Sequence, residues 1–415
     1  MRQSVYIGMN KIHLPIFVAK AIMYPTLSYI IYDLFGKYFP LPFFTFGIMM
    51  ALSFAAAYLV FVKEFKRKEM EGIIPSERVT KTFGTLPSMT DNIVSALVGG
   101  ILGFKILGLV LDYSLHSENP QEYIISTQGS VIGFILGVVF SAYLSYVEIS
   151  NLKKKYPEPV TKEVDVHPHE LMGSILMIAA ISGLIGAKLF DAMERWDEFI
   201  AHPIDQLMSF SGLTFYGGLI CGAIGVIWYT RKHKIPLLPL LDIGAPAMML
   251  AYGVGRIGCQ LAGDGDWGIV NTAPKPGWMS FLPDWMWAFD YPRNVAHEGT
   301  KILDHVPGTF INALEQPVFP TPFYEVIMGL LLFVFLWNIR KRIKIPGLLW
   351  AIYLMVNGLE RFFIEKIRVN SQYHFKSFAF TQAEMISSIL FVSGVVLTLY
   401  LLIKKNKSID VENHE

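Results

Sequence analysis

Charged side chains are scarce in this chain of 415 residues. Lys, Arg, Asp and Glu together make up 17% of it, whereas 53% is hydrophobic and 14% is aromatic. A soluble domain usually carries about a quarter charged residues, so the composition excludes an ordinary soluble protein and indicates a membrane protein with many spans. The formal net charge is only +1, and the sequence therefore predicts no nucleic-acid partner.

Cysteine is scarce as well, since the chain has only Cys221 and Cys259, and both lie in apolar segments. This excludes a disulfide framework, and we expect both thiols to behave as small buried hydrophobic side chains. The histidines lack the spacing of metal ligands, so the sequence predicts no metal and no cofactor. No short apolar core with a cleavage site follows the polar start of the chain, which predicts no cleavable signal peptide.

Long apolar segments, in contrast, are abundant. Each has the roughly 17–25 apolar residues that one bilayer crossing needs. The sequence therefore predicts an all-α polytopic membrane protein with about nine transmembrane helices. The predicted spans are residues 41–62, 92–113, 129–149, 171–193, 213–230, 238–262, 323–339, 346–364 and 380–403.

Three further segments are too polar, or too broken by proline, to span a bilayer. We expect residues 1–40 to form an external interfacial arm and residues 405–415 a cytoplasmic tail. Residues 263–322 separate the helical regions 41–262 and 323–404 and are expected to form a small external head segment. A tryptophan-rich part of this segment suits the membrane–water interface. We interpret the head as a cover over a site, and the alternative is a loop with an anchoring role only.

The loops alternate in charge along the chain, and this pattern predicts the orientation. Basic clusters gather in every second loop, at 63–81, 151–163, 231–234 and 339–344, whereas the alternate loops are acidic or mixed. Positive loops tend to stay in the cytoplasm, so the N-terminus is predicted to lie outside and the C-terminus in the cytoplasm.

Part of the apolar region is repeated within the chain. Residues 96–146 align without gaps onto residues 179–229, and both copies contain a Gly-X-X-Gly-X-Lys pattern, which ends at Lys105 or Lys188. We interpret residues 92–150 as a duplicated, inserted helical pair; the alternative is that two hairpins share a similar composition. The two lysines are expected to snorkel or to pair structurally, and contact with a lipid phosphate is the alternative.

Three motifs place polar groups at or near the ends of predicted spans. They are Gly253-Val254-Gly255-Arg256-Ile257-Gly258 with the following Asp264 and Asp266, then Pro320-Thr321-Pro322-Phe323-Tyr324-Glu325, and finally Arg361 to Arg368. An arginine at the end of an apolar segment is costly in lipid, so it normally faces a partner, a phosphate or water. All three motifs fall near outward-facing ends of separate spans, which predicts one site in one leaflet.

Together with Gly212-Leu213-Thr214-Phe215 and Gly217-Gly218-Leu219, these motifs resemble the prolipoprotein diacylglyceryl transferase family of bacterial inner-membrane enzymes. The resemblance covers roughly residues 170–400, and several separated motifs in family order make a specific signal. It implies transfer of a diacylglyceryl group from phosphatidylglycerol to the cysteine thiol of a lipoprotein precursor. The implied partners are phosphatidylglycerol, the signal peptide of the precursor and the lipid bilayer of the inner membrane.

The resemblance also implies a set of site residues. The expected catalytic residues are Tyr216, Arg256, Asp264, Arg361 and Glu365, and the expected substrate-binding residues are Gly217, Gly218, Gly255, Gly258, Tyr324, Glu325 and Arg368. Arg256 and Arg361 are expected to hold the phosphate, while Glu365 orients one of them from the same helix face. The alternative is an ordinary ion pair at a helix end.

The chain departs from the family pattern where acid–base chemistry is expected. Tyr216 stands where the family has a histidine, and both asparagines of the family's Gly-Asn-X-X-Asn-X-Glu run are missing. Tyrosine has a reference pKa of about 10, so it is a poor base unless nearby arginines lower that pKa. Asp264 is the expected replacement for the family's glutamate, with Asp266 and His297 as further candidates.

Two other functions therefore stay open at this point. One is a non-catalytic phospholipid-binding or lipid-transport relative that kept the phosphate clamp. The other is a phosphatidylglycerol-using transferase with a different acceptor.

Overall fold

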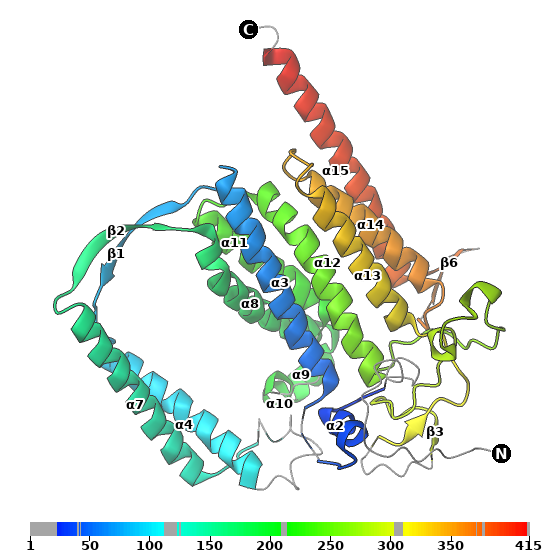
Figure 1. The fold of residues 1–415 in the computed structure, drawn as a ribbon, viewed down its shortest axis with the longest axis horizontal. Helices are drawn as coiled ribbons and strands as arrows, with labels where there is room; N and C mark the ends of the chain where they lie inside the picture. Colours follow the sequence, from blue (N-terminus) through cyan, green and yellow to red (C-terminus); the bar gives the residue numbers. More distant parts are fainter. Residues whose placement is uncertain are drawn as a thin grey trace. The chain divides into compact units, whose positions relative to one another are not determined.

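The structure is a computed structural model that describes residues 23–39, 41, 43–111, 123, 126–208, 214–302, 310–370, 372–375 and 378–412. The chain divides into two compact units (Figure 1). The first unit comprises Met1–Ala57 and Gly244–Glu415, and the second unit comprises Tyr58–Ile243. The beginning of the predicted arm, residues 1–22, lies outside the described residues.

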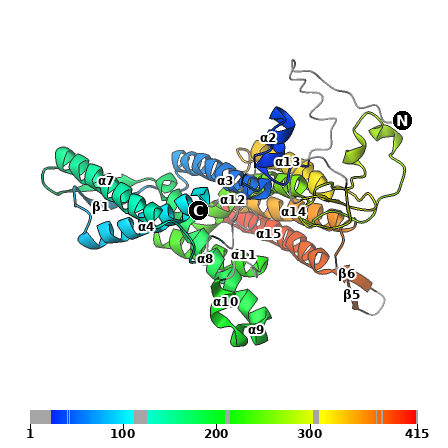
Figure 2. The same cartoon turned by 90° about the horizontal axis from the view of Figure 1, so that it is seen from below.

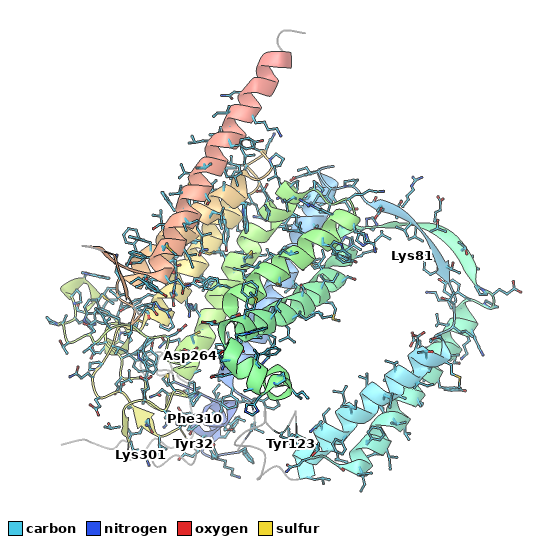
Figure 3. All side chains as sticks on the ribbon, turned by 180° about the vertical axis from the view of Figure 1, so that it is seen from behind. Tyr32, Lys81, Tyr123, Asp264, Lys301 and Phe310 are labelled. Carbon is cyan, nitrogen blue, oxygen red and sulfur yellow. The ribbon has the colours of Figure 1, made fainter. Side chains whose placement is uncertain are left out.

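Long apolar helices confirm the all-α membrane fold. Seven helical stretches among the described residues are long and apolar enough to cross a membrane. They belong to α3 (Thr45–Met70), α4 (Met89–Leu111), α7 (Val131–Lys155), α8 (Met172–Glu194), α12 (Leu237–Ala262), α13 (Thr321–Ile339) and α15 (Gln382–Glu412). Many of their large apolar side chains are exposed, as expected of side chains that face lipid (Figure 3).

The other two predicted spans are shorter helices, α11 (Phe215–Lys232) and α14 (Leu348–Glu365), each of 18 residues. α11 ends in a basic pair and α14 carries three charged residues, and neither helix is among the seven stretches that are long and apolar enough to cross a membrane. The number of nine crossings therefore stays a prediction.

The second unit contains two helical hairpins of the same design, in which α4 packs against α7 and α8 packs against α11. The strands β1 (Glu77–Phe83) and β2 (Val160–Val166) precede α4 and α8, and they pair with each other in antiparallel register. Both strands and both following helices begin and end 83 residues apart. These matching bounds support the proposed duplication of the hairpin.

The two repeated lysines have the same local role. Lys105 Nζ donates to the backbone carbonyls of Tyr123 and Gln128 at 2.8 Å, and Lys188 Nζ donates to that of Gln206 at 2.9 Å. Each lysine thus ties its helix to the connection within its own hairpin, which supports the structural interpretation. In the second hairpin that connection contains α9 (Trp196–Ala201) and α10 (Pro203–Met208), both visible in Figure 2, while the short helix η1 (Pro168–Leu171) leads into α8.

The first unit packs α12, α13 and α14 around a shared apolar core of Ala245, Met249, Leu336, Leu349 and Tyr353. Gly253 of α12 and Gly329 of α13 let these two helices come close, because a Cβ on Gly329 would lie only 3.0 Å from the Gly253 Cα. After α14, the hairpin of β5 (Gln372–Phe375) and β6 (Phe378–Thr381) leads into α15 (Figure 2). The close crossing of α12 and α13 brings their polar ends together.

The predicted head segment, residues 263–322, has a small core of its own. Its buried members are Trp267, Phe289, Tyr291 and Val318, together with Met23 of the arm. The segment contains the short helices η2 (Gly277–Met279) and η3 (Asp284–Met286) and the pair of strands β3 (Thr300–Lys301) and β4 (Asn312–Ala313). α2 (Leu27–Phe35), in the described part of the arm, contacts the head through the Tyr29 hydroxyl and the Phe310 carbonyl at 3.5 Å.

Candidate active site

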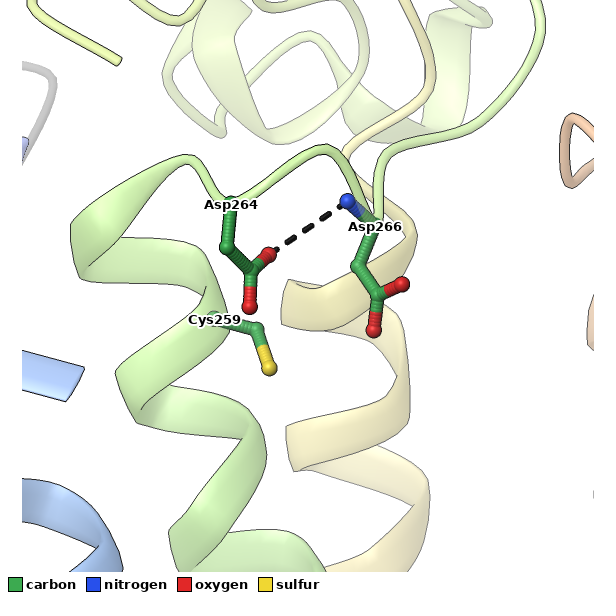
Figure 4. A group of neighbouring side chains, drawn as sticks. All are labelled: Cys259, Asp264 and Asp266. Atoms are coloured by element: carbon green, nitrogen blue, oxygen red, sulfur yellow. Dashed lines mark hydrogen bonds between the residues drawn. The ribbon is translucent and has the colours of Figure 1, made fainter. Parts of the chain in front are cut away.

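A tight turn at the end of α12 presents two acidic side chains. Gly263 adopts a left-handed conformation, with φ of 61°, and a Cβ there would lie 2.7 Å from Met23 and 2.9 Å from Asn294. Glycine is therefore required for α12 to stop at this point. The turn that follows is closed by the Asp266 backbone N–H, which donates to Asp264 Oδ1 at 3.3 Å (Figure 4).

Glu325 of α13 is the centre of the polar cluster, and its side chain is 0% exposed. Its carboxylate contacts Arg256 Nε at 3.2 Å, Arg361 Nη1 at 3.1 Å and Arg368 Nη1 at 3.3 Å. Tyr252, one helical turn before Arg256, donates its hydroxyl to Glu325 Oε1 at 3.0 Å. A buried carboxylate with three guanidinium partners is held firmly, because loss of one partner of a buried ion pair costs about 3–5 kcal/mol.

Asp266 is the second carboxylate of the cluster. It pairs with Arg256 Nη1, and with Arg368 Nη2 at 2.7 Å. The Thr321 hydroxyl, at the start of α13, donates to the Asp266 backbone carbonyl at 2.9 Å and holds the turn against that helix. Burial opposes the ionisation of Asp266, but the positive charges of Arg256 and Arg368 outweigh it and lower the pKa of this carboxyl below its usual value.

Glu365 completes the set of paired carboxylates. Its Oε2 lies 3.1 Å from Arg361 Nη2, and its Oε1 accepts a hydrogen bond from the Asn370 amide. α14 ends at Glu365, so Arg368 lies beyond the helix and does not share its face with Arg361 and Glu365. The isolated β-bridge between Gly268 and Arg368 fixes Arg368 beside the end of α12 instead.

The three arginines differ in exposure. The side chains of Arg256 and Arg361 are 17% and 26% exposed, while that of Arg368 is only 8% exposed. Arg256 uses Nε and Nη1 for the described contacts, and Arg361 uses Nη1 and Nη2. Within the described part of the chain, Nη2 of Arg256 and Nε of Arg361 therefore remain for another acceptor, whereas Arg368 is mainly structural.

Cys259, Asp264 and Asp266 lie close enough to ligate one metal ion, since their ligand atoms are within 4.8 Å of one another (Figure 4). The chemistry of this group does not fit a cation site. Asp266 is already paired with Arg256 and Arg368, and Arg256 Nη1 also lies 3.6 Å from Cys259 Sγ. Two positive charges at the same carboxylate oppose a metal ion.

Most of the predicted polar residues converge in this cluster. Arg256, Glu325, Arg361, Glu365 and Arg368 are joined by direct contacts, as described above. Tyr324 points elsewhere, because its hydroxyl donates to the Met286 carbonyl of the head at 2.8 Å.

Sequence reasoning missed part of the cluster. Asp266, considered only as a spare carboxylate, contacts the arginines, whereas Asp264 has no ion pair with a described residue. Tyr252 and Glu360 were missed altogether. The signal for Tyr252 was its spacing of four residues from Arg256, which places both side chains on one helix face.

The predicted glycines have packing roles in the structure. A Cβ on Gly258 would lie 3.1 Å from Met49, and one on Gly255 would lie 3.6 Å from Met50, both on α3. In the second unit, a Cβ on Gly217 would overlap the Gly186 carbonyl, and one on Gly218 would lie 3.4 Å from the Gly183 carbonyl. Close helix packing therefore accounts for Gly217 and Gly258 without a substrate, whereas a Cβ at Gly255 or Gly218 would make ordinary van der Waals contacts.

Tyr216 lies in the first turn of α11 in the second unit, and 39% of its surface is exposed. His297 of the head stacks on Phe310 with ring centroids 5.3 Å apart. The roles of both in acid–base chemistry stay predictions.

Comparisons with known proteins connect this site to a family. A model of the family described as prolipoprotein diacylglyceryl transferase matches residues 150–400. The chain is similar to the phosphatidylglycerol–prolipoprotein diacylglyceryl transferase of Enterococcus faecalis, with 29% identity over 259 residues that cover 61% of this chain and 81% of that protein.

Two further relatives carry the same name. The protein of Leptospira interrogans is 27% identical over 251 residues, which cover 54% of this chain and 67% of the relative. The protein of Corynebacterium glutamicum is 27% identical over 243 residues, which cover 57% of this chain and 71% of the relative. The family match contains the whole polar cluster and begins only near the end of α7, so the α4–α7 hairpin lies largely outside it.

Proposed function

Because the chain belongs to the prolipoprotein diacylglyceryl transferase family, we propose that it transfers a diacylglyceryl group from phosphatidylglycerol to the cysteine thiol of a lipoprotein precursor. The observation that carries this proposal is the buried cluster of arginines and carboxylates at the ends of α12, α13 and α14. Intramembrane ionisable groups that converge from separate helices are expensive and mark functional sites.

Arg256 and Arg361 bind the phosphodiester of phosphatidylglycerol. Their partial exposure and their remaining N–H groups suit an anionic ligand that enters from the lipid. Glu325 and Glu365 hold both guanidinium groups in place, which fixes the direction of those N–H groups before the substrate arrives.

The reaction forms one bond and breaks one. The sulfur of the precursor attacks the carbon of the diacylated glycerol that bears the phosphate oxygen, and a C–S bond forms. The bond between this carbon and the phosphate oxygen breaks, so that glycerol phosphate leaves with the electron pair. A free thiol has a pKa of about 8.5, so a neighbouring base is needed to form thiolate at neutral pH. Asp264 takes this proton, because its carboxylate forms no ion pair with an arginine among the described residues. The family resemblance makes Tyr216 a further candidate for the proton step.

The acceptor, the membrane and the orientation of the chain are part of the same proposal. The acceptor is the cysteine thiol of a lipoprotein precursor, whose signal peptide reaches the site through the lipid bilayer. The protein lies in the inner membrane as a multi-pass protein, with its N-terminus outside and its C-terminus in the cytoplasm, because basic clusters gather in every second loop.

The test is whether the full chain sustains lipoprotein modification in cells depleted of their own transferase. We expect growth and the appearance of diacylglyceryl-modified lipoprotein with the wild-type chain, and neither with Glu325→Gln at equal membrane abundance. Purified protein should release glycerol phosphate from phosphatidylglycerol only when a precursor peptide with its cysteine is present. Modification that is absent with the wild-type chain, despite normal membrane insertion, would contradict the proposed activity.

A further inference from the structure

Two carboxyl groups of the first unit share a single hydroxyl. Tyr252 Oη lies 3.0 Å from Glu325 Oε1 and 3.2 Å from Glu360 Oε1. A phenol carries one hydrogen, and an ionised carboxylate can only accept. Tyr252 therefore donates to only one of these oxygens, and the second contact requires a hydrogen on the other carboxyl group.

The surroundings decide which carboxyl group carries that hydrogen. Glu325 contacts three guanidinium groups, whose positive charges compensate a negative charge on its carboxylate. Glu360 is only 6% exposed, and it forms no ion pair with a described residue. Its Oε2 is buried and has no hydrogen-bond partner among the described residues. An ionised carboxylate with an unpartnered buried oxygen would be costly, whereas a neutral acid is far less so.

The charges of the cluster give an independent argument. Its three guanidinium groups face three paired carboxylates, which are those of Glu325, Glu365 and Asp266. These charges balance without Glu360. Ionisation of Glu360 would leave a net negative charge in a buried site that, in the proposed function, has to accept an anionic lipid.

We propose that Glu360 carries a proton in the resting site and that Glu360 and Tyr252 form a buried proton store for Glu325. Glu360 donates to Tyr252, and Tyr252 donates to Glu325. When the Tyr252 hydrogen moves to Glu325 and the Glu360 hydrogen moves to Tyr252, Glu360 becomes the anion and Glu325 becomes the neutral acid. The proton count is unchanged, and no oxidant or further reactant is needed.

This shift has a use in the reaction, a step that rests on the proposed function. Neutralisation of Glu325 releases the positive charge of Arg256 and Arg361 from their shared carboxylate. That charge then becomes available for the phosphate, whose negative charge grows as glycerol phosphate leaves. Glu360 and Tyr252 are positioning residues in this scheme, because they act through Glu325 and do not touch the substrate.

Infrared spectroscopy of the full-length protein in lipid nanodiscs tests for the proton. The carbonyl stretching band of a protonated, buried carboxylic acid should be present in the wild type and absent in Glu360→Gln. Glu194→Gln is the matched control, because Glu194 is an exposed carboxyl at the end of α8, and this variant should keep the band. The result does not depend on transferase activity, so it stands even if the proposed function fails.

Transfer kinetics test the movement of that proton. A glutamine at position 360 can donate to Tyr252 but cannot give up a proton, and Tyr252→Phe removes the link. Each variant should lower kcat by at least about tenfold, as expected for a lost proton-transfer partner, with little change in the KM for phosphatidylglycerol. The double variant should be no worse than either single variant, because all of them break one chain.

Three results would contradict the proposal. If the wild type and Glu360→Gln have the same carbonyl stretching bands, Glu360 is ionised in the wild type, and the proposal is overturned. A wild-type kcat in Glu360→Gln would show that the proton does not move. Additive losses in the double variant would assign both residues to separate packing roles.

Discussion

Arg256 makes its contacts through two different nitrogens of one planar group. Nε reaches Glu325 and Nη1 reaches Asp266, so a single guanidinium joins α12 to α13 and to the turn after α12. A lysine ammonium is a point charge and cannot reproduce this fork together with a bidentate contact to phosphate.

We therefore expect Arg256→Lys to lower the transfer rate by at least about tenfold at equal membrane abundance. Arg361→Lys should behave in the same way. Arg342→Lys is the control, because Arg342 is exposed in the loop after α13 and lies outside the cluster. Full activity of the Arg256 and Arg361 variants would assign both arginines to packing.

Tyr216 is the residue whose proposed role depends most on its hydroxyl. If that hydroxyl donates to the phosphate, Tyr216→Phe should fold normally and lose about 10²–10³ in rate, the usual cost of one missing donor at a developing charge. Tyr216→His should keep part of the activity, because imidazole is an effective acid and base near neutral pH. A Tyr216→Phe rate equal to that of the wild type would make Tyr216 an interfacial aromatic only.

At the scale of elements, the hairpin of α8 and α11 depends on a close approach of two backbones. A Cβ on Gly186 would overlap the Gly217 carbonyl oxygen and the Cys221 side chain. Gly186→Ala should therefore lower the free energy of unfolding by about 1–3 kcal/mol, the usual cost of overpacking. Denaturation in mixed micelles measures this change.

Gly173→Ala provides the matched control on the same helix. Nothing lies within 4 Å of a Cβ at Gly173, so this substitution should be neutral or slightly stabilising. Equal stability of the two variants would mean that the hairpin is not closely packed at Gly186.

A second element-scale feature is the contact between His167, just before η1, and Glu69 near the end of α3. His167 Nδ1 lies 2.5 Å from Glu69 Oε1, and this hydrogen bond raises the pKa of His167 above the reference value of 6.5. The protonated histidine therefore favours the folded state. Its contribution is complete below the pKa of the unfolded chain and is lost as the pH rises through the raised pKa of the folded state.

Thermal unfolding in detergent across the neutral range measures this dependence. The wild type should lose stability relative to His167→Asn as the pH rises, and Glu69→Gln should remove the same difference. The effect should be small, because the His167 side chain is 45% exposed and the pair is screened by solvent. Parallel pH profiles of wild type and His167→Asn would contradict a raised pKa.

At the scale of the whole molecule, the proposed orientation places the head segment outside the cell. A cysteine introduced at Ser280, an exposed residue of the head, should react with an impermeant thiol reagent added to intact cells. A cysteine at Ser150, near the basic end of α7, should react only after the membrane is opened. Labelling above the background of the native cysteines measures both, and the reverse pattern would place the candidate site on the cytoplasmic side.

The sequence by itself determined the class of the molecule. Its low charge and long apolar segments were sufficient for an all-α membrane fold, because bilayer thickness sets the length of each span. Its motifs were sufficient for the family. They also singled out Arg256, Glu325 and Arg361 as candidate site residues, because charged groups at the ends of apolar spans are costly in lipid. The repeat at an offset of 83 residues predicted two hairpins, and the bounds of α4 and α8 support that interpretation.

Only the tertiary structure decided which of these groups touch. Tyr252 and Glu325 are distant in the chain, and their contact depends on how closely α12 and α13 cross at Gly253 and Gly329. Glu360 reaches the same hydroxyl from a third helix, α14. The choice of Asp266 over Asp264 as the partner of the arginines depends on a turn that Gly263 makes possible. Helical spacing describes neighbours along one helix, whereas a buried ion cluster is set by distances between helices, which no local pattern encodes.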